Sequence, residues 1–447
     1  MPDALRQLAL IDTLLANWDL IRLRIGPVSP ALAREFITLG QKLGAATAIS
    51  EMTRIINDLL DLTKETPAAS YVRELIGRAS FGEAPSMRGP RVSGLVNPDI
   101  EAMIEAPAQA QESGANLGAV LGLSSALPLG VEQAPVFFAT NRKPNDGAAT
   151  GFSGDIAALT SYGLASVTIP TGIHQLGKLE APSWWNCLAN KKDQEKYFTL
   201  GALEGLKQAE FASRLESAAQ IAGTKELLIL LHGYNVTFEE AALRAAQFAH
   251  DSKFRGIVVL FSWPSQGSLQ GYAADEDRAM ASGDRLAAFL GALENGPWQR
   301  VHLLAHSMGN RVMLAGLADN PRPRLPLGQL VFAAADVYVA VFEEKFPKLQ
   351  NAGKLSATSY ASKKDRALWL SSLLHKGTRV GIVEGAPYVT DNLESIDATS
   401  VDRGMLGHGY WSDQRVLITD LQRLLQDGLS ADQRQLDRIG KYWAFPK

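Results

Sequence analysis

Ser307 stands where a nucleophile is expected. The stretch VHLLAHSMGNRVML (301–314) places this serine between an apolar run typical of a buried strand and an apolar stretch with helical spacing. Ala305 and Gly309, two residues to either side, are small, and a tight turn from strand to helix leaves no room for larger side chains. A serine displayed at such a turn can attack a carbonyl carbon, so the pattern predicts nucleophilic catalysis by Ser307.

A second strand-to-helix connection, in LLILLHGYNVTFEEA (227–241), offers hydrogen-bond donors to the same reaction. Its apolar strand ends at His232–Gly233, and a helix is predicted to begin a few residues later. A backbone N–H after such a His-Gly pair can point at the reacting carbonyl, and it forms an oxyanion hole together with the amide that follows the serine. We therefore predict that the backbone amides of Tyr234 and Met308 hold the oxyanion. We interpret His232 as a residue that orients this loop.

From residue 134 onward, strand-like runs alternate with helical ones. The strands are predicted at 135–142, 165–170, 226–233, 256–263, 300–307, 329–336, 354–362 and 393–399. The main helices are predicted at 238–250, 274–293, 308–318, 365–374 and 413–425. This alternation indicates a mostly parallel sheet covered by helices on both faces. In such a sheet, reactive groups collect where the carboxyl ends of the strands meet the loops that follow.

Six motifs occur in a fixed order along this part of the chain. They are ATNRK, YGLASVTIP, LLHGYNVTFEEA, VLFSWPSQGSLQGYAADE, LLAHSMGNRVML and LGHGYW. Together they resemble a bacterial family of α/β-hydrolases catalogued as a domain of unknown function, over residues 134 to about 428. The resemblance implies an α/β-hydrolase fold, a Ser-acid-His triad and an esterase- or lipase-like activity. It does not define a substrate.

The general base must come from the seven histidines, which are His174, His232, His250, His302, His306, His375 and His408. In α/β-hydrolases the nucleophile, the acid and the base follow one another along the chain, so the base is expected in a loop after the last strand. His408 lies between two glycines in SVDRGMLGHGYW, after the predicted strand at 393–399 and before the last helix. We predict His408 as the base and interpret His375, near the end of a predicted helix, as a helix residue.

Three aspartates after the serine are candidates for the triad acid. Asp336 ends the strand predicted at 329–336 and Asp365 comes shortly after the one predicted at 354–362, whereas Asp397 lies inside a predicted strand. The acid of most α/β-hydrolases follows the second strand after the nucleophile, which selects Asp365. Some lipases carry it one strand earlier, which would select Asp336. We predict Asp365 and keep Asp336 as the alternative; a helix N-cap is the structural alternative for Asp365.

The 447 residues are predicted to form several parts. Residues 1–80 form a helical region, 81–133 a linker rich in Gly, Pro and Ala, 134–430 the α/β-hydrolase domain, and 431–447 a C-terminal tail. The N-terminal helices bury little apolar area by themselves. They are therefore expected either to mediate self-association or partner binding by docking on another surface, or to form an independent small bundle on a flexible linker.

Composition excludes several classes of protein. With a net charge of −3, the protein has no overall positive electrostatic field that would attract nucleic acid. Cys187 is the only cysteine, which excludes an intramolecular disulfide. No signal sequence is recognised, and the weakly polar run at 116–131 is shorter than the ~20 residues of a membrane span. We expect a cytoplasmic protein with no transmembrane segment, no cofactor and no metal site.

These observations predict a serine hydrolase that cleaves small-molecule or lipid carboxylic esters through an acyl-enzyme. One alternative is a lipase or phospholipase that acts at a membrane and touches it with the linker before residue 134. The other is a catalytically idle hydrolase scaffold used for binding, against which the presence of every residue type of the triad argues.

Overall fold

The computed structural model describes residues 127–145, 151–180, 194–266, 272–321, 323–350, 355–365, 368, 372, 377–402 and 410–446. All of these residues belong to one compact unit of the chain. Outside the described residues lie the helical region predicted at 1–80, the predicted linker up to residue 126, His375 and His408.

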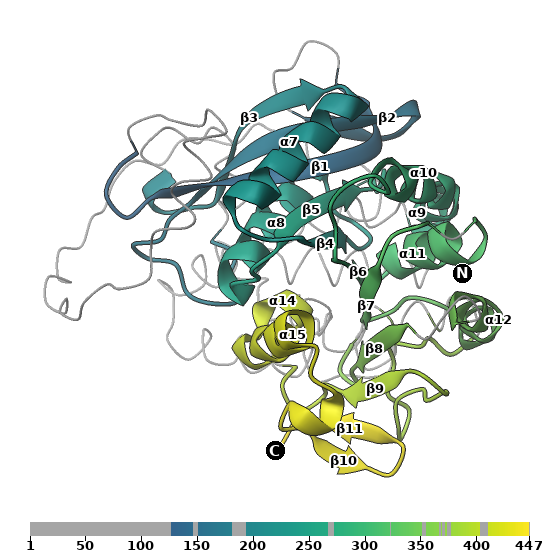
Figure 1. Cartoon of the computed structure of the whole chain (residues 1–447). Helices are drawn as coiled ribbons and strands as arrows, with labels where there is room; N and C mark the ends of the chain where they lie inside the picture. Colours follow the sequence, from purple (N-terminus) through teal and green to yellow (C-terminus); the bar gives the residue numbers. More distant parts are fainter. Residues whose placement is uncertain are drawn as a thin grey trace, which may run out of the picture. The chain divides into compact units, whose positions relative to one another are not determined.

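An 11-stranded sheet forms the centre of this unit, in the order β10-β11-β9-β8-β7-β6-β4-β5-β1-β2-β3 (Figure 1). The strands are β1 (Glu132–Pro144), β2 (Phe152–Ile169), β3 (Thr199–Leu206), β4 (Glu226–Leu231), β5 (Ile257–Ser262), β6 (Arg300–His306), β7 (Leu327–Ala333), β8 (Ser356–Ala361), β9 (Glu394–Asp397), β10 (Asp437–Ile439) and β11 (Tyr442–Ala444). The pairs from β1 to β11 through the middle of the sheet are parallel. The outermost strands β2, β3 and β10 pair antiparallel with their neighbours.

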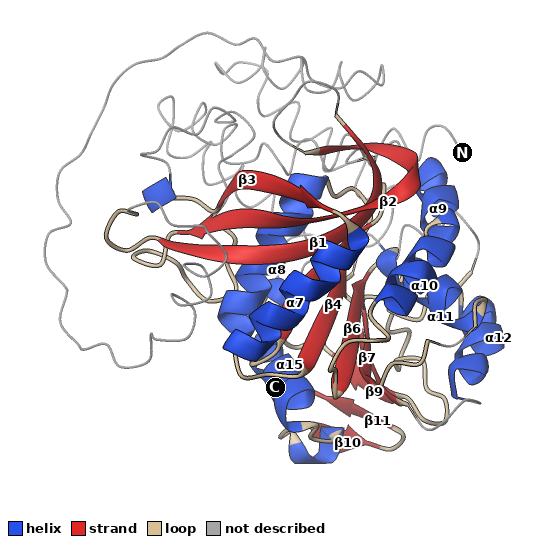
Figure 2. Ribbon diagram, turned by 45° about the horizontal axis from the view of Figure 1, so that its top comes forward, coloured by secondary structure: helices blue, strands red, loops and turns tan. Residues whose placement is uncertain are grey.

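Helices cover both faces of this sheet (Figure 2). They are α7 (Gln208–Ile221), α8 (Phe238–Ser252), α9 (Tyr272–Ala281), α10 (Gly283–Ala292), α11 (Gly309–Ala318), α12 (Val339–Gln350), α14 (Tyr410–Asp413) and α15 (Arg415–Asp427). One apolar cluster joins α8 and α15 to the sheet, and a second joins α7, α10, α11 and α12 to its other face. The predicted α/β-hydrolase fold, a mostly parallel sheet flanked by helices, is thereby confirmed.

The continuous apolar sequence of β4 follows from this burial on both sides. Leu227, Ile229 and Leu231 belong to the cluster with α7 and α10–α12, whereas Leu228 and Leu230 belong to the cluster with α8 and α15. Because successive side chains of a strand point to opposite faces, a strand covered on both faces must be apolar at every position.

The structure differs from the predicted elements in several places. β3, α7 and α12 were not predicted, and the single helix predicted at 274–293 is two helices that meet at Ser282. A Cβ on the next residue, Gly283, would lie 2.5 Å from Ala315 Cβ, so α10 packs closely on α11 there. Residues 431–447, predicted as a tail, include a 3-10 helix (Ala431–Gln433) and the β10–β11 hairpin, which extends the sheet beyond β9.

The carboxyl ends of the parallel strands bring the predicted site residues to one edge of the sheet. β4 ends one residue before His232, and β6 ends one residue before Ser307. Asp336 follows the end of β7, and Asp365 follows the end of β8. Within the part of the chain that the structure describes, no helix combines the length and apolar content that crossing a bilayer requires.

Candidate active site

Ser307 has a left-handed backbone conformation, with φ of +52°. A residue with a Cβ adopts this region at a cost, and the surrounding structure must hold it there. Its N–H donates to Ala333 O at 3.0 Å, and its carbonyl oxygen accepts from Asn310 N (3.1 Å), Asn310 Nδ2 (2.9 Å) and Asp336 N (3.2 Å). The side chain is 2% exposed. This is the sharp strand-to-helix turn that a nucleophilic serine requires.

Two glycines let the end of β4 approach this turn closely. A Cβ on Gly309 would lie 2.4 Å from His232 O, and a Cβ on Gly233 would lie 2.9 Å from Ser307 Cβ. Both contacts are too short for any other residue type. The peptide that carries the Tyr234 amide directly follows Gly233, and Met308, fully buried, directly follows the serine. The loop after β4 and the turn after β6 therefore meet, as an oxyanion hole formed by these two amides requires.

His232 holds the loop after β4 from within. Its Nδ1 donates to Gly233 O at 2.8 Å, its ring stacks on Trp263, and its carbonyl oxygen accepts from Trp263 Nε1 at 2.7 Å. Burial, followed by the nearby positive charge of Arg142, lowers the pKa of His232 to about 3, so the ring is neutral near pH 7. These contacts agree with the interpretation of His232 as a residue that orients the loop.

Asp336 lies beside the elbow, the strand-to-helix turn of residues 305–309, but positively charged side chains contact its carboxylate. Oδ1 is 3.2 Å from Arg379 Nε and 3.7 Å from an Arg311 nitrogen, and Oδ2 accepts from Tyr272 Oη at 2.5 Å. Asp336 is 1% exposed and Arg379 fully buried. Such a set of partners is typical of a carboxylate that anchors structure, because a buried carboxylate beside a buried guanidinium is held by that charge.

Asp365 follows β8, the second strand after the one that leads into Ser307, as predicted. It is 1% exposed, and its Oδ1 accepts from Leu368 N at 3.0 Å. This is a helix N-cap contact, and Leu368 and Ser372 are helical. The loop with His408 lies outside the described residues, so the pairing of acid and base stays a prediction.

Comparison with known proteins identifies the domain that carries this site. Residues 207–427 match the family described as alpha/beta hydrolase of unknown function (DUF900). A search of curated proteins finds no match. Among solved structures, the chain is similar to LpqC, a poly(3-hydroxybutyrate) depolymerase from Bordetella parapertussis, with 13% identity, a TM-score of 0.30, and coverage of 72% of this chain and 98% of that one.

Arg142, at the end of β1, supports the site of the hydrolase domain although it precedes the matched residues. The side chain is buried and reaches the loops that follow β4 and β5. Its three nitrogens donate to Val236 O (2.7 Å), Ser265 O (2.8 Å) and Ser262 Oγ (2.9 Å), and it also contacts His232 Nε2 (3.2 Å). Burial lowers the pKa of Arg142 to about 9, which leaves it charged near pH 7. The ATNRK motif marked this region, but not the role of its arginine.

Asp402 is a further buried carboxylate of the hydrolase domain that the sequence did not single out. It is 1% exposed, and its Oδ2 accepts from Ser362 Oγ at 2.6 Å, which joins the loop after β9 to the end of β8. Lys364 Nζ donates to its carbonyl oxygen at 3.0 Å. The sequence signal was present, because Asp402 lies in the same stretch as His408, SVDRGMLGHGYW, six residues before it. Asp397, by contrast, accepts from Thr399 N within its own turn.

Proposed function

We propose that this α/β-hydrolase is a serine esterase that cleaves carboxylic esters through a covalent acyl-enzyme. Ser307 is the nucleophile, His408 the general base, and Asp365 the acid that orients and charge-stabilises His408. The backbone amides of Tyr234 and Met308 hold the oxyanion. The substrate is a small-molecule or lipid ester.

One observation carries the proposal, the left-handed backbone of Ser307 at the end of β6 (φ +52°). A serine in an ordinary turn has no need of this conformation, and strain of this kind costs about 1–3 kcal/mol. The hydrogen bonds to its peptide groups and the close approach of Gly233 and Gly309 sustain it. Strain that the surroundings hold at a strand-to-helix turn supports a nucleophile more than it supports a packing role.

The proposed reaction starts when Ser307 Oγ attacks the ester carbonyl carbon and its proton passes to His408. The carbonyl oxygen becomes an oxyanion, to which the two amides donate. When the tetrahedral intermediate collapses, the C–O bond to the alcohol breaks, and His408 returns the proton to the leaving oxygen. Water then attacks the acyl-enzyme with His408 again as base, which releases the acid and restores Ser307.

Asp275 holds the start of the loop after β5, next to the contacts of Arg142. Its carboxylate accepts from Ser265 Oγ at 2.7 Å and from Gln266 N at 3.0 Å, while Ser265 O accepts from Arg142. Burial raises the pKa of Asp275. The start of the loop after β5, at Ser265 and Gln266, is thus held in place beside Arg142.

A fluorophosphonate probe tests the nucleophile. Wild-type protein should be labelled covalently, and Ser307→Ala should not, because the probe reacts only with an activated serine. Heat-unfolded wild type serves as the control for non-specific labelling. Equal labelling of wild type and Ser307→Ala would remove Ser307 from the role. No labelling of native wild type, together with no turnover across esters of short to long acyl chains, would instead indicate a scaffold used for binding.

A further inference from the structure

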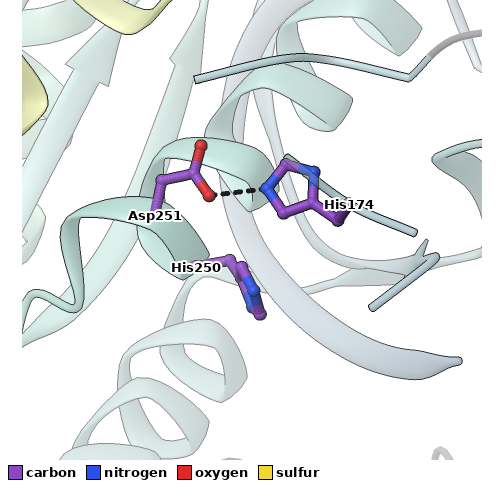
Figure 3. A group of neighbouring side chains, drawn as sticks. All are labelled: His174, His250 and Asp251. Atoms are coloured by element: carbon purple, nitrogen blue, oxygen red, sulfur yellow. Dashed lines mark hydrogen bonds and ion pairs between the residues drawn. The ribbon is translucent and has the colours of Figure 1, made fainter. Parts of the chain in front are cut away.

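His174, His250 and Asp251 form a cluster away from the catalytic edge. His174 lies in the turn after β2, while His250 and Asp251 are at the carboxyl end of α8 (Figure 3). One potential ligand atom from each lies within 4.8 Å of the others. The amino end of α8 follows the loop of Tyr234, and a helix of 15 residues is about 22 Å long. The cluster is therefore separate from the proposed esterase site.

Hydrogen bonds to residues outside the cluster orient His174 and Asp251. His174 Nδ1 is 2.6 Å from Glu180 Oε2, which directs His174 Nε2 toward Asp251 Oδ1, also at 2.6 Å. Asp251 Oδ2 accepts from Gly177 N (2.8 Å) and Gln247 Nε2 (2.7 Å), which leaves Oδ1 on the side of the cluster. Metal-bound histidines and carboxylates in proteins are held in this way by outer partners.

We propose that His174, His250 and Asp251 bind a divalent transition-metal ion of the zinc class. The donor set of two imidazole nitrogens and one carboxylate oxygen is typical of zinc, and it disfavours magnesium and calcium, which prefer oxygen ligands. His174 Nε2 and Asp251 Oδ1 are the first two ligands, His250 the third, and water completes the tetrahedron.

The geometry requires a small local adjustment. Ligand atoms in a tetrahedral zinc site lie about 3.3 Å apart, given metal–ligand distances of about 2.0–2.2 Å. His174 Nε2 and Asp251 Oδ1 would separate by roughly 0.7 Å, and the proton between them would pass to solvent as the metal takes its place. The His250 ring, whose centroid is 5.4 Å from that of His174, would move toward them by a change of side-chain rotamer.

Charge also favours a cation here. Without metal, two carboxylates face one histidine: the side chains of His174, Glu180 and Asp251 are 4%, 8% and 0% exposed. Even with His174 protonated, this buried group carries one net negative charge, whereas a divalent cation with neutral imidazoles would make it neutral.

The metal would join three parts of the domain. Gln247, which donates to Asp251, also donates to Ser412 O at 3.0 Å, in α14. A bound ion would therefore connect the turn after β2, the end of α8 and, through Gln247, the short helix that follows the loop of His408. The sequence did not indicate this site, because His174 and His250 are far apart in the chain.

Calorimetric titration of chelator-treated, full-length protein with zinc chloride tests the proposal, and the visible spectrum of bound cobalt reports the ligand set. We expect one zinc ion to bind to wild type and to Cys187→Ser, and magnesium not to bind. His250→Ala removes a ligand and leaves the pair of His174 and Asp251 intact. Glu180→Gln removes only an outer partner, and should weaken binding by about 10- to 100-fold, less than His250→Ala.

Circular dichroism of each variant establishes that it is folded, and His250→Asn replaces His250→Ala if the latter is not. Zinc binding of equal affinity to wild type and to the folded His250 variant would overturn the proposal. So would the absence of zinc binding to wild type, and the cluster would then be a metal-free imidazolium held between two carboxylates. In that case His174→Gln lowers the melting temperature equally with and without zinc.

Discussion

Asparagine substitutions at Asp336 and Asp365 can show which of the two carboxylates stabilises the fold and which one supports catalysis. In Asp336→Asn, the buried guanidinium of Arg379 loses a carboxylate at 3.2 Å. Removing one partner of a buried ion pair costs about 3–5 kcal/mol, because the other charge remains desolvated. The Tyr338 ring lies 3.8 Å from Arg379 Cζ and offsets part of this cost. We therefore expect Asp336→Asn to lower the free energy of unfolding by about 3 kcal/mol, the lower end of that range.

Asp365→Asn should have the opposite profile. The amide oxygen of asparagine can accept from Leu368 N as Asp365 Oδ1 does, so the helix cap is retained. Asparagine and aspartate are similar N-caps, and we expect a change in unfolding free energy below about 1 kcal/mol. The charge that stabilises protonated His408 is lost, which should lower kcat on the order of 10⁴-fold.

Urea unfolding and ester turnover, measured on the same preparations, distinguish the two profiles. Turnover is compared only under conditions in which urea titration shows each variant to be folded, and Ser307→Ala sets the background rate. The reasoning is refuted if folded Asp336→Asn is inactive while Asp365→Asn keeps most of its turnover. The acid would then follow β7, the strand immediately after the nucleophile.

Three further perturbations test the support around the elbow. Gly309→Ala places a Cβ 2.4 Å from His232 O and should destabilise the protein by about 1–3 kcal/mol in thermal unfolding, whereas Gly291→Ala, with nothing within 4 Å, should stabilise α10 by about 0.5–1 kcal/mol. In Arg142→Lys, a single ammonium group cannot replace the guanidinium, one nitrogen of which donates to Val236 O, so kcat/KM should fall by about 100-fold in a folded variant. Unchanged kinetics would contradict this. His232 binds a proton below about pH 6.5 in the unfolded chain, but only near its pKa of about 3 in the folded chain. The stability measured by urea unfolding should therefore decrease as the pH is lowered through this window, by up to ~1.4 kcal/mol per pH unit. His232→Gln should reduce this slope.

The sheet, and the edge at which Ser307, Asp336 and Asp365 lie, were predictable because burial on both faces leaves a strong pattern in the sequence. Strands such as β4 and β6 are mostly apolar, with runs such as Leu227–Leu231 and Leu303–Ala305, and they stand out between amphipathic helices. The small residue at position 309 was predictable from the sharp turn at Ser307, although the contact that excludes a Cβ there is a long-range one, with His232 O at the end of β4. β3 and α12 escaped prediction because their exposed residues interrupt the apolar pattern.

The partners of buried charges were not predictable, because no local spacing encodes them. Arg142 meets Val236 and Ser265 only after β1 has paired with β5, and the arginines of Asp336 come from α11 and the loop before β9. The choice between Asp336 and Asp365 therefore rested on the order of strands alone. The structure adds information that the order of strands does not contain, namely that Arg379 and Arg311 lie beside the carboxylate of Asp336.

The elbow draws its conformation from long-range contacts and not from its own sequence. Ser307 prefers other backbone regions, and three of the four hydrogen bonds on its peptide groups involve Ala333 or Asn310. Asn310 Nδ2 bridges the carbonyl oxygens of both Ser307 and Ala333, at 2.9 and 3.3 Å, so α11 and β7 hold the turn from two sides. Strain persists only where the surroundings over-determine it. The rigidity that a displayed nucleophile needs is thus a property of the β6–α11–β7 unit, and the asparagine of AHSMGN is part of that unit rather than a spacer.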